Sequence, residues 1–141
     1  MTRLGAQTDG IPLPRPSHIS QPFWDGCRAG RLLYQRCETC GHIVFEPAPL
    51  CRWCTGRFLQ WEQSQGQGNV YSWTVAYRPQ TEAFTVPYAP VIVDLDEGFQ
   101  MLSNVIDCDT NDLAVGMRVV VEFREVGPMT LPYFRPACRT R

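Results

Sequence analysis

The sequence predicts a mainly β protein that has a short N-terminal helix, a four-cysteine metal-binding ribbon and a five-stranded barrel. Three observations predict this architecture. Two Cys-x-x-Cys pairs lie in the first half of the chain, short runs of period-2 alternation follow Leu59, and 12 prolines and 11 glycines favour turns over a helical bundle. We expect an extended proline-rich arm at residues 1–19, the helix and zinc ribbon at 20–58, and the barrel with a C-terminal tail at 59–141.

Composition narrows the classes of function. The 141 residues are 44% apolar and 19% charged, which is typical of a folded globular protein. The net charge is −1, and all 13 basic residues are arginines scattered along the chain, which disfavours nucleic-acid binding. No apolar run reaches the roughly 20 residues of a membrane helix, and Met1–Gly10 lacks the apolar centre of a secretory signal. We therefore expect a cytoplasmic protein, in which seven cysteines favour metal ligation over disulfides.

The N-terminal segment combines an extended arm with one short helix. Four prolines between residues 12 and 22 indicate an arm of polyproline character, which either wraps a neighbouring subunit or forms a mobile tail, and we favour the mobile tail for residues 1–16. Ser20 is the predicted N-cap of a helix over residues 20–31, with Pro22 in the first turn and Gly30 as its stop. An extended strand at Leu32–Arg36 is expected to lead into the first cysteine pair.

Five short strands are predicted after the ribbon. Alternation over residues 70–77, 91–95 and 118–124 suits half-buried strands, and the Asp96–Gly98 turn before residues 99–106 is a hairpin signal. With Leu59–Ser64 they make five strands without a long intervening helix. Five strands of this length suit a small closed barrel such as the OB-fold.

The metal motif is the strongest chemical signal in the chain. Cys37 and Cys40 form one pair, and Cys51 and Cys54 form a second pair ten residues later. A structural zinc ion takes four thiolates in a tetrahedron and keeps no open position. The sequence therefore predicts one structural zinc per chain. Iron in a single-iron site with the same four ligands, and a redox Cys-x-x-Cys pair, are the alternatives.

Catalytic chemistry by this chain alone is not expected, and we assign no catalytic residue. Cys27, Cys108 and Cys138 have no ligand spacing and no His–carboxylate neighbours that would activate a nucleophile. His42 is expected to be a surface residue beside a closed metal site, and His18 is expected to be solvated.

The order of several motifs resembles one protein family over residues 20–136. The motifs are Leu32–Cys37 with Cys40-Gly41, Phe45-Glu46-Pro47, Leu50-Cys51 with Cys54, Gly66–Val75 and Val115–Val119. Together they resemble the acyl-CoA-associated OB-fold proteins with an N-terminal rubredoxin-like zinc ribbon. One departure is Arg52-Trp53, because the family often has proline after the third cysteine.

The resemblance implies a non-catalytic accessory subunit of a thiolase-fold enzyme. Such partners include acetyl-CoA acyltransferases, hydroxymethylglutaryl-CoA synthase and lipid-transfer-type aldolases that shorten steroid side chains held as CoA thioesters. Among these we favour a retro-aldol carbon–carbon lyase of a steroid or other bulky side chain over an acyltransferase. The chain is then expected to stabilise its partner in a hetero-oligomer, for example of two copies of each chain, and to help form the acyl-CoA entrance.

Two sets of residues are candidates for these contacts. Exposed aromatic side chains dominate protein interfaces, and the interface candidates are Phe23, Trp24, Trp53, Tyr133 and Phe134. Arg78 and Arg124 are candidates to bind CoA phosphates.

Two other classes of function stay open at this stage. A single-stranded nucleic-acid-binding module could stack bases on Tyr71, Trp73 and Tyr77. An electron carrier would hold iron at the four cysteines. The slightly negative net charge disfavours nucleic-acid binding, and elemental analysis of the bound metal tests the electron carrier.

Overall fold

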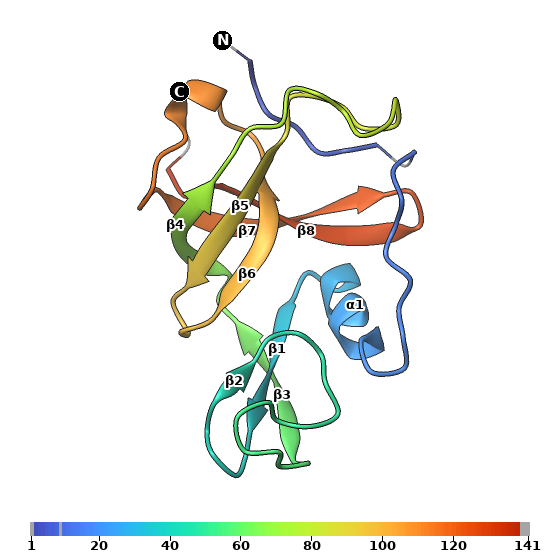
Figure 1. Ribbon diagram of the computed structural model, residues 1–141, viewed down its shortest axis with the longest axis vertical. Helices are drawn as coiled ribbons and strands as arrows, with labels where there is room; N and C mark the ends of the chain where they lie inside the picture. Colours follow the sequence, from blue (N-terminus) through green and yellow to red (C-terminus); the bar gives the residue numbers. More distant parts are fainter. Residues whose placement is uncertain (1, 9, 139–141) are drawn as a thin grey trace.

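The computed structural model describes residues 2–8 and 10–138, and a three-stranded ribbon stands beneath a closed barrel (Figure 1). Helix α1 (Gln21–Arg28) precedes β1 (Leu32–Cys37), β2 (Ile43–Val44) and β3 (Leu59–Ser64), which form an antiparallel sheet in the order β2-β1-β3. The barrel contains β4 (Gln67–Trp73), β5 (Ala89–Leu95), β6 (Gln100–Val105), β7 (Arg118–Val126) and β8 (Met129–Pro136). A 3-10 turn, η1 (Thr110–Asp112), connects β6 to β7. The predicted fold class is confirmed.

The barrel closes in the order β4-β5-β6-β8-β7, and this order corrects one prediction. Leu59–Ser64, predicted as a barrel strand, instead pairs along its whole length with β1 in the ribbon. The fifth barrel strand is β8, which the sequence analysis did not predict as a strand. Two prolines, Pro132 and Pro136, interrupt its alternation, yet it pairs with β7 from Val119↔Pro136 to Val126↔Met129.

Helix α1 is shorter than predicted but begins and ends for the expected reasons. Ser20 occupies the N-cap position, although its hydroxyl makes no capping bond and accepts instead from the backbone N–H of Ser17, at 2.8 Å. Gly30 has φ of +76°, a left-handed conformation that glycine adopts without steric cost, so the helix stops there. Gly26 allows the helix to approach β1 closely, because a Cβ on it would lie 2.7 Å from Leu33.

Ribbon and barrel share one hydrophobic core. Tyr34 and Phe45 of the ribbon contact Phe99 of the barrel, with ring centroids 5.1 and 5.0 Å apart, and Phe23 packs edge-on against Phe45 at 5.7 Å. Because these rings belong to one buried cluster, the ribbon cannot rotate freely against the barrel.

A polar clamp fixes the short connection between β3 and β4. Glu97, in the turn between β5 and β6, accepts hydrogen bonds from the Ser64 hydroxyl at 2.7 Å and the Gln65 N–H at 2.8 Å. The Val121 N–H donates to the Gly66 carbonyl at 2.7 Å. The clamp therefore sets the direction in which the ribbon leaves the barrel.

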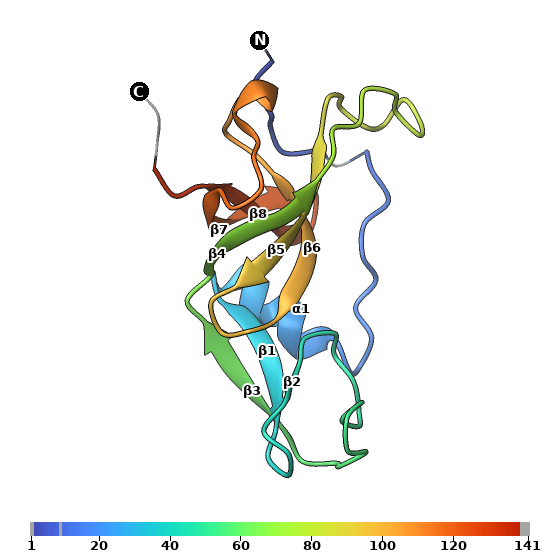
Figure 2. The ribbon, with the colours of Figure 1, turned by 60° about the vertical axis from the view of Figure 1, so that its left-hand side comes forward.

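The N-terminal arm packs on the barrel, and the prediction of a mobile tail is wrong for residues 2–8. Leu4 is 1% exposed, its N–H donates to the Cys108 carbonyl, and its carbonyl accepts from the Asp107 N–H. Both views show the arm crossing the end of the barrel away from the ribbon (Figures 1 and 2). Within the described part of the chain, no helix is long and apolar enough to cross a membrane.

Replacing Leu4 with alanine tests the packing of the arm. We expect Leu4→Ala to lower the free energy of unfolding by about 2–4 kcal/mol, because it leaves a cavity in the core. Leu102→Ala is the matched control, because Leu102 is 72% exposed, and we expect a change within about 0.5 kcal/mol. Urea unfolding followed by circular dichroism measures both. Equal, small effects would contradict a docked arm.

Candidate metal centre and surrounding surfaces

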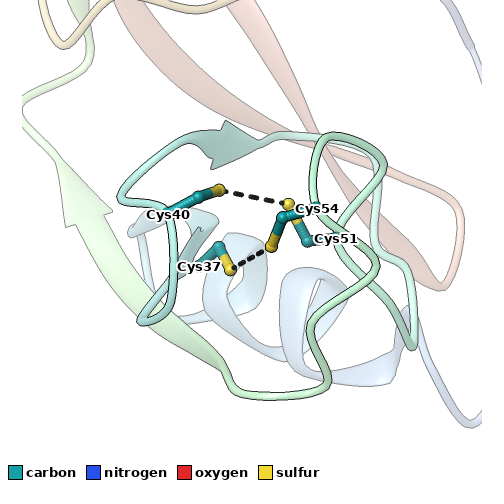
Figure 3. A group of neighbouring side chains, drawn as sticks. All are labelled: Cys37, Cys40, Cys51 and Cys54. Carbon is teal, nitrogen blue, oxygen red and sulfur yellow. Dashed lines mark hydrogen bonds between the residues drawn. The ribbon is translucent and has the colours of Figure 1, made fainter.

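The four predicted ligands converge at the far end of the ribbon. Cys37 ends β1, Cys40 lies in the turn before β2, and Cys51 and Cys54 come from the loop between β2 and β3 (Figure 3). Their sulfur atoms all lie within 4.8 Å of one another. Two cross-loop pairs, Cys37–Cys54 and Cys40–Cys51, have sulfur–sulfur distances of 3.6 Å. Four sulfurs bound tetrahedrally to zinc at about 2.3 Å would lie about 3.8 Å apart, so the four cysteines are placed to hold one metal ion.

Backbone N–H groups surround the sulfurs and favour thiolates. The N–H groups of Trp53 and Gly56 donate to the sulfurs of Cys51 and Cys54, both at 3.4 Å. The backbone N–H of Cys40 is the main cause that lowers the pKa of the Cys37 thiol to about 6. The backbone N–H groups of His42 and Gly56 act in the same direction on Cys40 and Cys54, but desolvation and the neighbouring sulfurs outweigh them, so the pKa of the Cys40 thiol is raised to about 12 and that of the Cys54 thiol is raised. Hydrogen bonds to a sulfur stabilise its charged form, which is the form that binds a metal.

The ribbon around the site has little apolar core of its own. Its buried cluster contains only Cys37, Val44 and Cys51, with Cys40, Ala48 and Leu59 packed against them. Cys37 and Cys51 are buried, while Cys40 and Cys54 are more exposed. The sulfurs therefore lie where a larger domain would place hydrophobic side chains, and a metal bound to them would link the two loops.

An exposed stack of side chains covers the metal loops. The Trp53 indole is 60% exposed, stacks on His42 with centroids 5.0 Å apart, and carries the Arg52 guanidinium 5.4 Å from its centroid. His42 Nδ1 lies 3.3 Å from the Cys40 sulfur. His42 is a surface residue, as predicted, and it also connects the stack to the metal site. The Arg52-Trp53 departure noted in the sequence thus lies on the outer surface of the ribbon.

The remaining interface candidates lie elsewhere, and three of them are buried. Phe23 is 6% exposed, Tyr133 is 3% exposed and Phe134 is 0% exposed, so they pack inside the chain's own core and do not form an exposed docking surface. Sequence reasoning placed Tyr133 and Phe134 in a tail because β8 was not predicted. Trp24 is half-buried and packs edge-on against Phe23 at 4.9 Å.

The two arginine candidates differ in what their side chains contact. Arg78 is exposed in the loop after β4. Arg124, on β7, is paired with Asp107 at 2.8 Å and with Glu122 at 2.6 Å. The charge of Arg124 is therefore already balanced by two carboxylates, which leaves it poorly suited to bind a phosphate.

The aromatic residues considered for base stacking are exposed. Tyr71, Trp73 and Tyr77 are 56%, 39% and 67% exposed, on β4 and just after it. The charge of Arg118, at the start of β7, is balanced by an ion pair with Asp96, as that of Arg124 is by its two carboxylates.

Serine substitution of one ligand tests the metal centre. We expect Cys51→Ser to lose the metal and to unfold the ribbon, because binding of a structural metal supplies folding free energy, about 10–16 kcal/mol for zinc-finger peptides. Cys138→Ser is the control, since Cys138 is exposed and away from the site. Elemental analysis and circular dichroism measure the outcome. A folded Cys51→Ser protein without metal would show that the metal is dispensable.

Comparisons with known proteins agree with this geometry. Residues 24–61 match the family model described as "ChsH2, rubredoxin-like zinc ribbon domain", and residues 61–124 match "ChsH2, C-terminal OB-fold domain". A probable enoyl-CoA hydratase alpha subunit from Thermomonospora curvata is 37% identical over 88% of this chain and 40% of its own length. A DUF35 domain-containing scaffold protein from Pyrococcus furiosus is 30% identical over 89% of this chain and 98% of its own.

A solved structure has the same architecture. A chain of the Ltp2-ChsH2(DUF35) aldolase superposes with a TM-score of 0.82 and 32% identity, over 89% of this chain and 100% of that chain. This chain thus spans about two fifths of the hydratase subunit but nearly the full length of the scaffold protein and of the aldolase chain. It belongs to the ChsH2 (DUF35) family, in which a rubredoxin-like zinc ribbon precedes an OB-fold domain.

Proposed function

We propose that this chain is a non-catalytic scaffold subunit of a thiolase-fold enzyme that acts on acyl-CoA thioesters. The observation that supports it most is the similarity, along the full length of the other chain, to the ChsH2 chain of the Ltp2-ChsH2(DUF35) aldolase. The relative from Pyrococcus furiosus, named a scaffold protein, supports the same role. Within this role we favour a retro-aldol carbon–carbon lyase of a bulky acyl group, such as a steroid side chain, and a cytoplasmic complex.

The chemistry of the side chains supports a partner that carries the catalytic residues. Burial raises the pKa of the Cys27 thiol to about 12 and that of the Cys108 thiol to about 11, so both stay protonated and unreactive at neutral pH. His42 lies against the metal site, and His18 is exposed in the arm. The sulfur that His42 contacts belongs to Cys40 of the four-cysteine site, and no other histidine–thiol contact occurs among the described residues.

We propose zinc as the metal at the four cysteines. A closed set of four thiolates suits a structural zinc ion, which needs no open position and no redox change. The protein as purified is expected to be colourless and to contain one zinc per chain by elemental analysis. A coloured protein with one iron per chain would contradict zinc and favour an electron carrier.

The exposed stack on the ribbon is the proposed docking surface for the partner. Tryptophan and arginine are the side chains most enriched at energetically dominant interface positions, and Trp53 and Arg52 lie side by side. The shared aromatic core holds the ribbon in one orientation, so the stack is presented rigidly. Of the two arginine candidates, the exposed Arg78 is the better placed to meet a CoA phosphate.

Affinity purification from native cells tests the proposed role. We expect the tagged chain to recover a thiolase-fold enzyme in near-equal amount, identified by mass spectrometry. Recovery of the chain alone, or with nucleic acid, would contradict the scaffold role.

Two variants then test the docking surface. We expect Trp53→Ala to weaken binding of that partner by about 2 kcal/mol or more, which is about 30-fold. Tyr77→Ala is the matched control, because Tyr77 is 67% exposed and lies in the loop after β4. Titration calorimetry with the purified partner measures both. Equal affinities for Trp53→Ala and the wild type would show that the partner docks elsewhere.

A further inference from the structure

An apolar pocket of about 340 Å³ lies beside the barrel, and none of the four metal-site cysteines lines it. Its walls come from separate segments of the chain: α1, the ribbon loop after β2, the loop between β4 and β5, the strands β6 and β8, and the arm at its rim. Six aromatic rings line it: Phe23, Trp24, Phe45, Phe84, Tyr88 and Tyr133. Three of them are residues that the sequence analysis had assigned to a partner interface.

Hydrogen bonds within the walls hold these segments together. The Gln7 side chain makes two bonds with Thr85, donating to its carbonyl at 2.9 Å and accepting from its N–H at 2.7 Å. The Gln7 N–H donates to the Tyr133 hydroxyl at 3.2 Å, and the Ser103 hydroxyl donates to the Pro132 carbonyl at 2.8 Å. Because these polar groups of the walls bond to one another, the pocket presents mainly carbon to an occupant.

The lack of charged side chains in the described lining restricts the kind of molecule that the pocket can bind. None of the described residues that line the pocket is charged, so a phosphate or carboxylate would lose its hydration there without compensation. Asn104, on β6, also lines the pocket, and its Oδ1 is buried without a hydrogen-bond partner among the described residues. A polar group of an occupant that reaches Asn104 would give this oxygen the hydrogen bond that it lacks.

We propose that this pocket binds the uncharged, hydrocarbon-rich part of a small molecule that carries at most one polar group. Its volume lies within the range of small-molecule sites, about 300–1,000 Å³, and such sites combine apolar walls with few polar groups. If the proposed function holds, the occupant is the acyl part of the thioester, while the charged CoA part stays outside. This last assignment rests on the proposed function, whereas binding of a neutral apolar molecule does not.

Binding of a neutral fluorescent probe tests the pocket. The zinc-loaded chain is titrated with N-phenyl-1-naphthylamine, whose emission rises in apolar surroundings. We expect saturable binding of one probe per chain, displacement by decan-1-ol, and no displacement by free CoA. Absence of saturable binding, or displacement by CoA instead of decan-1-ol, would overturn the proposal.

Two pocket variants and one control locate the bound probe. Leu131→Trp fills the pocket, and Leu102→Asp places a charge at its mouth, where the Leu102 side chain is 72% exposed. We expect each to weaken probe binding about tenfold or more, because the first removes space and the second brings a charge against apolar groups. Val115→Asp is the matched control, since Val115 is 71% exposed and outside the lining, and it should bind like the wild type. Equal binding by Leu102→Asp and Val115→Asp would place the probe elsewhere and overturn the proposal.

Failure of this inference can be told apart from failure of the scaffold role. If the proposal for the pocket is wrong, the wild-type chain still recovers its thiolase-fold partner but does not bind the probe at this site. If the scaffold role is wrong, no such partner is recovered, whatever the probe does.

Discussion

The convergence of four cysteine sulfurs from two loops is the constraint on which the ribbon's arrangement rests. The two Cys-x-x-Cys turns approach from different segments, and almost no hydrophobic core lies between them. Without a metal, the four thiol side chains would be all that holds the two loops together. Thiols alone stabilise a fold less than a packed hydrophobic core or a bound metal does. The order of β1, β2 and β3 comes from backbone pairing, and the cysteine site at the end of this sheet brings the two loops together.

The ribbon in turn depends on the barrel for its direction. The contact of Tyr34 and Phe45 with Phe99 merges two small cores into one, and Glu97 fixes the connecting backbone from the barrel side. A ribbon held in this way presents Trp53 as a rigid feature, so a partner does not have to order it on binding. The same packing brings α1 against the barrel and forms one wall of the apolar pocket.

The sequence predicted the features that local patterns determine. Cysteine spacing identified the four sulfurs that converge, period-2 alternation and the Asp96–Gly98 hairpin turn identified four of the barrel strands, and Gly30 marked the end of the helix. It did not predict features that depend on distant pairing. Leu59–Ser64 has the alternation of a barrel strand, but its partner is β1, while β8 is interrupted by prolines and recognised only by its pairing with β7. Nothing local indicated that Leu4 would be buried or that Gln7 would pair with Thr85.

The proposed scaffold role joins these features. In this proposal, a metal-linked ribbon presents the docking surface, the barrel and helix enclose a neutral pocket, and the partner supplies the reactive groups. The most direct test of this division is the steady-state rate of acyl-CoA cleavage by the purified partner, by this chain, and by the two together. The account predicts no turnover by this chain alone and faster turnover by the partner once the chain is added. Turnover by this chain alone, or a partner rate unchanged by its addition, would contradict it.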